Sequence, residues 1–301
     1  MFNLLEISET NTKVSVCNSC LYVQCGDGSS RSISFNDLNA IILANPAMSL
    51  TGHVLLERGT HRVPVVCCEK SFSPVAVLTP IPLNGAEHDF MLEAQLDASK
   101  PFKKRLWKHI ITAKIRGQSH VLLKERKDDS LSSLCSSVMS GDSGNIEAQA
   151  ARVYWKSLDV FPRRDRLAQD ANIFFNYVYT IVYSAFARYI CSMALHPHLG
   201  IRHHNQYNPF CLASDLMEPF RPAADCVALA LLGNTDSISL SRPNREFLIR
   251  HLYDCAIDIA GESCPLFSAV RRTALSFRQC LLQNNPDLIE LPHWNISAKE
   301  A

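Results

Sequence analysis

Residues 140–155 carry polar side chains in a region whose flanking sequence is apolar and helical in its periodicity. The Gly/Ser/Asp-rich start of this segment predicts a turn, and the small residues that follow predict a helix with Asn145 as its N-cap. Glu147 then lies in the first turn of that helix. A carboxylate at this position either interacts with the positive end of the helix dipole or serves as a metal ligand.

A second polar segment, residues 199–222, holds two adjacent histidines, His203 and His204, and two acidic residues, Asp215 and Glu218. The pattern predicts a loop that carries the histidine pair, followed by a short helix that prolines end or kink. Asp215 and Glu218 are three residues apart, so this helix would place both carboxylates on one face.

Glu147, His203 and Glu218 together could bind one divalent metal ion. Two carboxylates and one imidazole suit magnesium or manganese, and the imidazole favours manganese. A metal ion in such a site can polarise a phosphodiester and stabilise a departing oxyanion. The predicted chemistry is therefore a metal-dependent reaction at a phosphodiester.

Ten lysines and arginines lie within residues 100–127, where Glu125 is the only acidic residue. Such a run forms either a solvated helix face or a stripe that binds phosphates. Trp107 and His109 are interleaved with the basic residues, and a second basic group follows Pro162. The basic residues that we expect to contact a nucleic-acid backbone are Lys103, Lys104, Arg105, Lys108, Lys114, Arg163, Arg164, Arg166 and Arg221.

The scaffold that must position these residues changes its hydrophobic periodicity once along the chain. Residues 1–79 contain short apolar or β-branched runs separated by turn residues, which predicts a β-rich domain. Residues 80–88 hold two prolines and a glycine and predict a linker. Residues 89–290 have helical periodicity, and residues 291–301 look like a tail. The predicted fold class is α+β, with a small β-rich N-terminal domain followed by a larger all-helical catalytic domain.

The helical pattern is strong enough to predict individual helices. The expected ranges are 88–97, 101–116, 118–126, 145–158, 168–195, 223–233, 244–260 and 265–282. The most apolar stretch, residues 173–195, contains Asn176, Thr180, Ser184 and Arg188, which is typical of a buried helix rather than a membrane span.

The chain contains twelve cysteines, among them the pair Cys17 and Cys20. The N-terminus has neither the positive region nor the apolar core of a signal peptide, so we expect cytoplasmic thiols rather than disulfides. A zinc site at Cys17 and Cys20 would need a second such pair, which is missing. We favour small buried apolar residues in strands.

Overall composition narrows the class of protein further. The 301 residues are 47% hydrophobic and 20% charged, with a net charge of +1. These values exclude a disordered chain and a globally basic nucleic-acid binder, although not a locally basic one.

Four segments make the sequence resemble the CRISPR-associated Cas1 integrases, and most closely those of type II systems, subtype II-C-like. They are GDSGNIEAQAARVYW, NYVYTIVYSAFARYI, HPHLGIRHHNQYNPFCLASDLMEPFRP and KIRGQSHVLL. The resemblance covers about residues 35–282. It implies a β-rich domain followed by a helical catalytic domain, in agreement with the periodicity.

The resemblance also implies a metal triad, which falls on Glu147, His203 and Glu218. His203, rather than His204, matches the family position three residues after Gly200. Asp215 matches a second acidic position and is expected, like Asn145, to support the ligands by hydrogen bonding. Val178 departs from the glycine that related sequences often have, and its mid-helix position leaves the triad unaffected.

The implied activity is integration of captured foreign DNA into a CRISPR array, by attack of a 3′-hydroxyl on a phosphodiester. The expected cofactor is magnesium or manganese. The expected partners are double-stranded DNA, the Cas2 protein and a second copy of the chain, with four chains on a Cas2 dimer. A non-catalytic DNA-binding scaffold and a stand-alone metal-dependent nuclease remain as alternatives.

Overall fold

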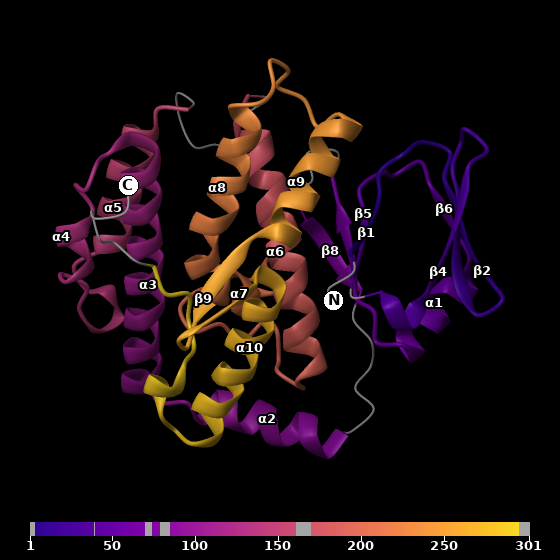
Figure 1. Ribbon diagram of the computed structural model, residues 1–301. Coiled ribbons are helices and arrows are strands. Elements are labelled where there is room, and N and C mark those ends of the chain that lie inside the picture. The colour runs from indigo at the N-terminus through magenta and orange to yellow at the C-terminus, as the bar shows by residue number, and fades with distance from the viewer. Residues whose placement is uncertain (1–3, 39, 70–73, 79–84, 161–169, 295–301) are drawn as a thin grey trace.

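The N-terminal part of the chain forms two four-stranded β-sheets (Figure 1). The structure, a computed structural model, describes residues 4–38, 40–69, 74–78, 85–160 and 170–294. The first sheet has the order β1 (Leu4–Ile7), β5 (Ala40–Leu43), β7 (Val65–Cys68) and β8 (Pro74–Leu78). The second sheet has the order β4 (Ser30–Ser34), β3 (Cys20–Gln24), β2 (Lys13–Cys17) and β6 (Ser49–Leu50). The β1–β5 and β5–β7 pairs are parallel, whereas β8 runs antiparallel to β7.

A small hydrophobic core lies between these sheets and the helix α1 (Gly52–Thr60). Strand residues alternate between the two faces of a sheet, and Val14, Leu21 and Ile41 are the inward members that pack with Val54 of α1. A 3-10 turn, η1 (Phe35–Asp37), adds Phe35 to the same core.

The opposite face of the first sheet packs against the helical part of the chain. Ile42 and Val66 belong to the same hydrophobic cluster as the residues of the long helix α6. The helices of this part are α2 (Gly85–Asp97), α3 (Lys100–Arg126), α4 (Ser132–Cys135), α5 (Ile146–Leu158), α6 (Asn172–Ser192), α7 (Cys211–Leu216), α8 (Arg221–Leu232), α9 (Arg242–Asp254) and α10 (Leu266–Leu282). The short 3-10 turns are η2 (Ser140–Asp142), η3 (Glu218–Phe220) and η4 (Pro286–Leu288).

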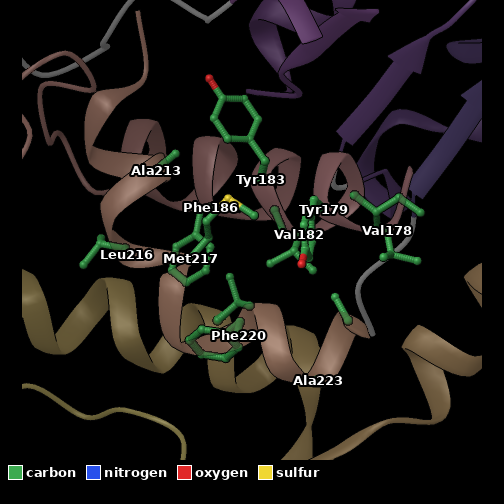
Figure 2. Packing of buried hydrophobic residues seen from close by; sticks show 14 of the residues in the cluster. Val178, Tyr179, Val182, Tyr183, Phe186, Ala213, Leu216, Met217, Phe220 and Ala223 are labelled. Atoms are coloured by element: carbon green, nitrogen blue, oxygen red, sulfur yellow. The ribbon is translucent and has the colours of Figure 1, made fainter. Parts of the chain in front are cut away.

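Helix α6 lies at the centre of the helical part, as its apolar composition predicts. Figure 2 shows Val182 and Phe186 of α6 among side chains of the segment that follows the histidine loop, including Met217 and Phe220. The rings of Phe186 and Phe220 meet edge to face at 5.3 Å between their centroids. In the described part of the chain, no helix is both long and apolar enough to cross a bilayer.

Helix α3 is continuous, whereas the sequence predicted a break near Gly117. The helix runs from Lys100 to Arg126, so one glycine in its interior does not end it. The glycine serves close packing instead. A Cβ at Gly117 would lie 2.7 Å from Cγ of Pro222 and 2.8 Å from the indole nitrogen of Trp294.

A β-hairpin interrupts the segment that was expected to be entirely helical. Strands β9 (Ala256–Ile259) and β10 (Glu262–Pro265) pair in antiparallel register. The turn between them places Ala260 and Gly261 at φ values of 49° and 80°. Helix α9 therefore ends at Asp254, and the prediction of a helix over residues 244–260 is wrong for its last residues.

The cysteines are all free thiols. Only Cys68 is both buried and in a strand, and Cys211 and Cys280 are buried in the helical part. Cys17 is exposed at the β2–β3 turn, so the expectation of buried strand cysteines holds only for Cys68.

Candidate active site

Glu147 lies at the start of α5, after a tight turn that orients it. Asp142 accepts hydrogen bonds from the backbone N–H groups of Ile146 (2.8 Å) and Glu147 (3.1 Å). Asn145 makes no side-chain cap, because its φ of 50° is left-handed and not the extended conformation from which a capping side chain reaches the helix. The prediction that Asn145 caps the helix is therefore wrong, and Asp142 has that role.

Lys114 of α3 lies between the two carboxylates that were expected to bind a metal ion. Its Nζ is 2.6 Å from Oε1 of Glu147 and 2.6 Å from Oε2 of Glu218. The sequence placed Lys114 on a DNA-binding surface, but only 10% of its side chain is exposed. Helical spacing explains the difference, because position 114 falls on the face of α3 that carries the buried residues Ile110, Ile111 and Gln118.

Glu218 is the more buried of the two carboxylates, with 6% of its side chain exposed against 27% for Glu147. Burial alone would raise the pKa of Glu218, but Arg221 and Lys114 lower it to about 2. Burial would lower the pKa of Lys114, and the two glutamates reverse this effect and raise it. Glu218 and Lys114 are therefore both charged at neutral pH.

Asp215 and Glu218 lie on different elements, although the sequence predicted that both share one face of a single helix. Helix α7 ends at Leu216, and Glu218 begins the separate 3-10 turn η3. The fully buried Asp215 accepts hydrogen bonds from the backbone N–H groups of Ile201 (2.6 Å) and Arg202 (2.9 Å). It also contacts the Nδ1 atom of His203, so it orients the imidazole as a supporting carboxylate would.

This contact fixes the orientation of the His203 side chain, which is 46% exposed. The hydrogen bond to Asp215 raises the pKa of His203, with further contributions from Glu218 and Glu147 that burial opposes. The ring meets Trp107 edge-on, with centroids 5.9 Å apart. Trp107 is 2% exposed and so belongs to the wall of the site rather than to an exposed basic stripe. Because Asp215 engages Nδ1, Nε2 is the nitrogen that could ligate a metal ion.

Arg221 holds the other side of Glu218, in a polar network that the sequence analysis did not find. Its Nε lies 3.0 Å from Oε1 of Glu218, and its guanidinium lies 4.5 Å above the ring of Tyr179. The buried Asp225 accepts hydrogen bonds from the hydroxyls of Tyr179 and Tyr154, the latter at 2.8 Å. An aspartate within the otherwise apolar helix α8 was the available signal.

The donor set fits a divalent metal ion in its chemistry. Oε2 of Glu218 is buried and lies 2.6 Å from the Lys114 ammonium, which balances its negative charge. Glu147, Glu218 and Nε2 of His203 provide the oxygen and nitrogen ligands that manganese or magnesium takes. Within the described residues, no group of three or more His, Cys, Asp or Glu side chains is arranged so that it could hold a metal ion. The cation between the glutamates is the Lys114 ammonium.

A cavity of about 300 Å³ opens beside this network. Arg221, Tyr179 and Met217 line its inner side, and the exposed loop residues Asn205 and Tyr207 line its mouth. Arg221 connects the cavity to Glu218, which does not itself line it.

The exposed basic residues of α3 form a smaller surface than the sequence predicted. Lys104 and Lys108 are exposed and Lys103 is half-buried. Arg105 pairs with Asp287 of η4 at 2.6 Å, and His109 contacts the same carboxylate at 2.9 Å. Arg221 is part of the buried network described above, and Arg163, Arg164 and Arg166 lie outside the described residues.

Comparison with known proteins identifies the family. The sequence model of the family described as "CRISPR associated protein Cas1" matches residues 5–239. A CRISPR-associated endonuclease Cas1 of Neisseria meningitidis serogroup C (strain 8013) is 31% identical over 272 residues, which is 88% of each chain. A second such endonuclease, from Saccharolobus solfataricus, is 27% identical over 237 residues, covering 76% of this chain and 75% of its own.

Solved structures share the fold at lower identity. A casposase bound to its integration product superposes with a TM-score of 0.80 and 19% identity, over 100% of this chain and 94% of the casposase. A Cas1 protein of Thermotoga maritima gives a TM-score of 0.75 and 17% identity, over 93% of this chain and 97% of its own. The β-rich part followed by a helical part is thus the Cas1 fold. Because the family's sequence model also matches most of its length, the chain belongs to the Cas1 family of CRISPR-associated endonucleases and integrases.

Proposed function

We propose that this protein is a metal-dependent DNA strand transferase of CRISPR adaptation, which joins the 3′-hydroxyl of a captured DNA fragment to a phosphodiester of the repeat. One observation carries the proposal: Glu147 and Glu218 both contact the Lys114 ammonium, and the charges of both raise the pKa of His203, although 56 residues separate Glu147 from His203 and 15 separate His203 from Glu218. Two carboxylates and an imidazole bound to one metal ion would serve phosphoryl transfer.

Glu147, Glu218 and His203 would hold the metal ion, magnesium or manganese. When bound, the ion would polarise the phosphodiester and stabilise the departing oxygen. Asp215 keeps the imidazole oriented, and Arg221 with the Tyr179–Asp225 network keeps Glu218 ionised and in place. No protein nucleophile is needed, because the attacking hydroxyl belongs to the DNA.

Two groups of partners follow from the relatives. The solved assembly of similar fold named a Cas6-RT-Cas1–Cas2 complex has a TM-score of 0.81 and 18% identity, over 96% of this chain and 36% of that one, and the casposase carries an integration product. For this chain we propose double-stranded DNA and Cas2 as partners, in a cytoplasmic assembly of two chain dimers on one Cas2 dimer. The type II, II-C-like assignment from the sequence motifs belongs to the same proposal.

The experiment is a strand-transfer assay with a labelled 3′-hydroxyl DNA fragment and a repeat-bearing duplex. It is run with and without Cas2, and with manganese, magnesium or a chelator. We expect transfer that needs both the metal ion and Cas2. Cleavage without transfer, independent of Cas2, would identify a stand-alone nuclease instead. DNA binding with neither reaction would identify a non-catalytic scaffold.

A further inference from the structure

Lys114 is the strongest unassigned feature of the site, because it occupies the centre of the candidate metal centre and not a surface. Its ammonium is within 2.6 Å of one oxygen of Glu147 and one oxygen of Glu218. It is a buried cation on the rigid helix α3, and its stem lies among core residues of that helix. Neither the metal chemistry proposed above nor DNA binding at the surface explains this position.

The geometry makes Lys114 a competitor of the metal ion. Both glutamate oxygens lie at hydrogen-bond distance from Nζ, so a cation that binds both oxygens must take the place of Nζ. Two cations cannot share so small a space without strong repulsion. The lysine side chain has a flexible four-carbon stem, so its ammonium can move while helix α3 stays fixed.

We infer that Lys114 is a resident counter-ion of Glu147 and Glu218, which a divalent metal ion must displace when it binds. Metal binding is then an exchange of one cation for another and not a simple addition. The inference rests on the proposed metal-dependent function. Its consequence is that Lys114 weakens the intrinsic metal affinity of the site while it holds the two carboxylates together before the metal ion arrives.

The exchange also links metal binding to DNA binding. A displaced ammonium near the core needs a new anionic partner, since an unpaired buried charge is costly. The proposed substrate supplies such a group as a phosphodiester. Metal and DNA should therefore each improve the binding of the other, and part of this coupling should depend on Lys114.

The test measures manganese binding to the purified full-length protein by electron paramagnetic resonance of the free ion. Lys114→Gln should lower the dissociation constant by about tenfold or more, because one positive charge leaves the site. Lys114→Arg, which keeps the charge, should bind manganese as weakly as the unmodified protein or more weakly. Lys156→Gln removes an exposed charge from α5 and should leave manganese affinity unchanged.

Thermal unfolding gives a second readout that does not depend on activity. Without metal, Lys114→Gln should unfold at a lower temperature, because Glu147 and the buried Glu218 then lack the cation between them. The same excess of manganese should raise the Tm of Lys114→Gln more than that of the unmodified protein, since the stabilisation grows with the logarithm of ligand concentration divided by the dissociation constant. Lys114→Met is the second variant, in case glutamine prevents folding.

A short DNA duplex provides the coupling measurement. In the unmodified protein the duplex should tighten manganese binding, and in Lys114→Gln this effect should shrink. If the unmodified protein binds manganese and Lys114→Gln binds it equally well or more weakly, the inference is overturned and the proposed function stays intact. Absence of manganese binding in the unmodified protein and in every Lys114 variant would overturn both.

Discussion

Glu147 and Glu218 differ in surroundings, although they face the same ammonium. Glu218 is nearly buried between Arg221 and Lys114, which hold its pKa at about 2. Glu147 lies on the more open side and is fixed by the Asp142 turn through the backbone of α5. We therefore assign Glu218 to the rigid back of the site and Glu147 to the side that meets solvent and substrate.

Glu147→Ala should abolish strand transfer and leave DNA binding largely intact. The lost carboxylate is a ligand, so the loss should exceed the about 10- to 100-fold effect that is usual for a residue that only supports a ligand. Strand transfer and duplex binding are measured on the same preparation. Glu125→Ala, an exposed acid of α3, is the matched control. Integration at the unmodified rate in Glu147→Ala would refute its assignment.

His203→Ala should weaken manganese binding and reduce strand transfer by orders of magnitude, whereas His204→Ala should retain most activity. The physical reason is that Asp215 holds the ring of His203 at Nδ1 and that the charges of both glutamates raise the pKa of this histidine. Manganese titration and the strand-transfer assay are run on both variants. The reverse result, an inactive His204→Ala beside an active His203→Ala, would shift the ligand by one residue.

Helix α3 illustrates how one element serves two roles on two faces. Its buried face carries Trp107 and Lys114 into the site, and its exposed face carries Lys104 and Lys108. Asp287 of η4 neutralises Arg105 and contacts His109 on a neighbouring part of the surface. Among the α3 residues that were expected to contact DNA, Lys104 and Lys108 are therefore the exposed ones that pair with no acidic residue in the described part of the chain.

Replacing Lys104 and Lys108 together by glutamine should weaken binding of all duplexes about equally. The slope of log affinity against log salt concentration should fall by roughly 0.9 for each lost phosphate contact. Arg105→Gln should change the slope less, because Asp287 already pairs with this side chain. Duplex binding is measured at several salt concentrations. An unchanged slope in the double variant would mean that these lysines form only a solvated face.

At the scale of the whole molecule, the β-rich and helical parts are joined by a shared core and by a charged contact. Glu6 of β1 pairs with Arg245 of α9 at 2.8 Å and accepts a hydrogen bond from the Tyr177 hydroxyl of α6. Leu4 donates its backbone N–H to the Tyr253 hydroxyl at 2.8 Å. The first sheet is thus tied to three helical residues close to the middle of the molecule.

Glu6→Ala should lower the free energy of unfolding by about 1–3 kcal/mol, because it removes the acceptor and counter-ion of partly buried groups. Glu9→Ala removes an exposed carboxylate that lies 3.7 Å from Arg242 and should cost less than about 1 kcal/mol. Chemical denaturation of both variants measures the difference. Equal effects would show that the Glu6 contacts do not stabilise the molecule.

The sequence predicted the β-rich and helical organisation well, because apolar residues recur every two residues in strands and about every 3.6 residues in helices, and both patterns can be read from one sequence. It did not predict the β9–β10 hairpin, since the short run from Ala256 to Ile259 fits a helix or a strand equally well without knowledge of its partners. The residues that we propose as metal ligands were recognisable from motifs. Lys114 and Asp225 were not, because burial of a charge depends on which residues from distant elements surround it.

The close contact at Gly117 limits how this site could be transferred to another protein scaffold. Gly117 lies three residues from Lys114 on α3, and the Pro222 ring that it meets is the neighbour of Arg221. Because Gly117 has no side chain, helices α3 and α8 approach closely. This contact fixes the distance between Lys114 and the Glu218–Arg221 pair. A graft of the proposed ligands alone would therefore lack this fixed spacing. It must also carry the glycine, the proline and Trp294 as one unit.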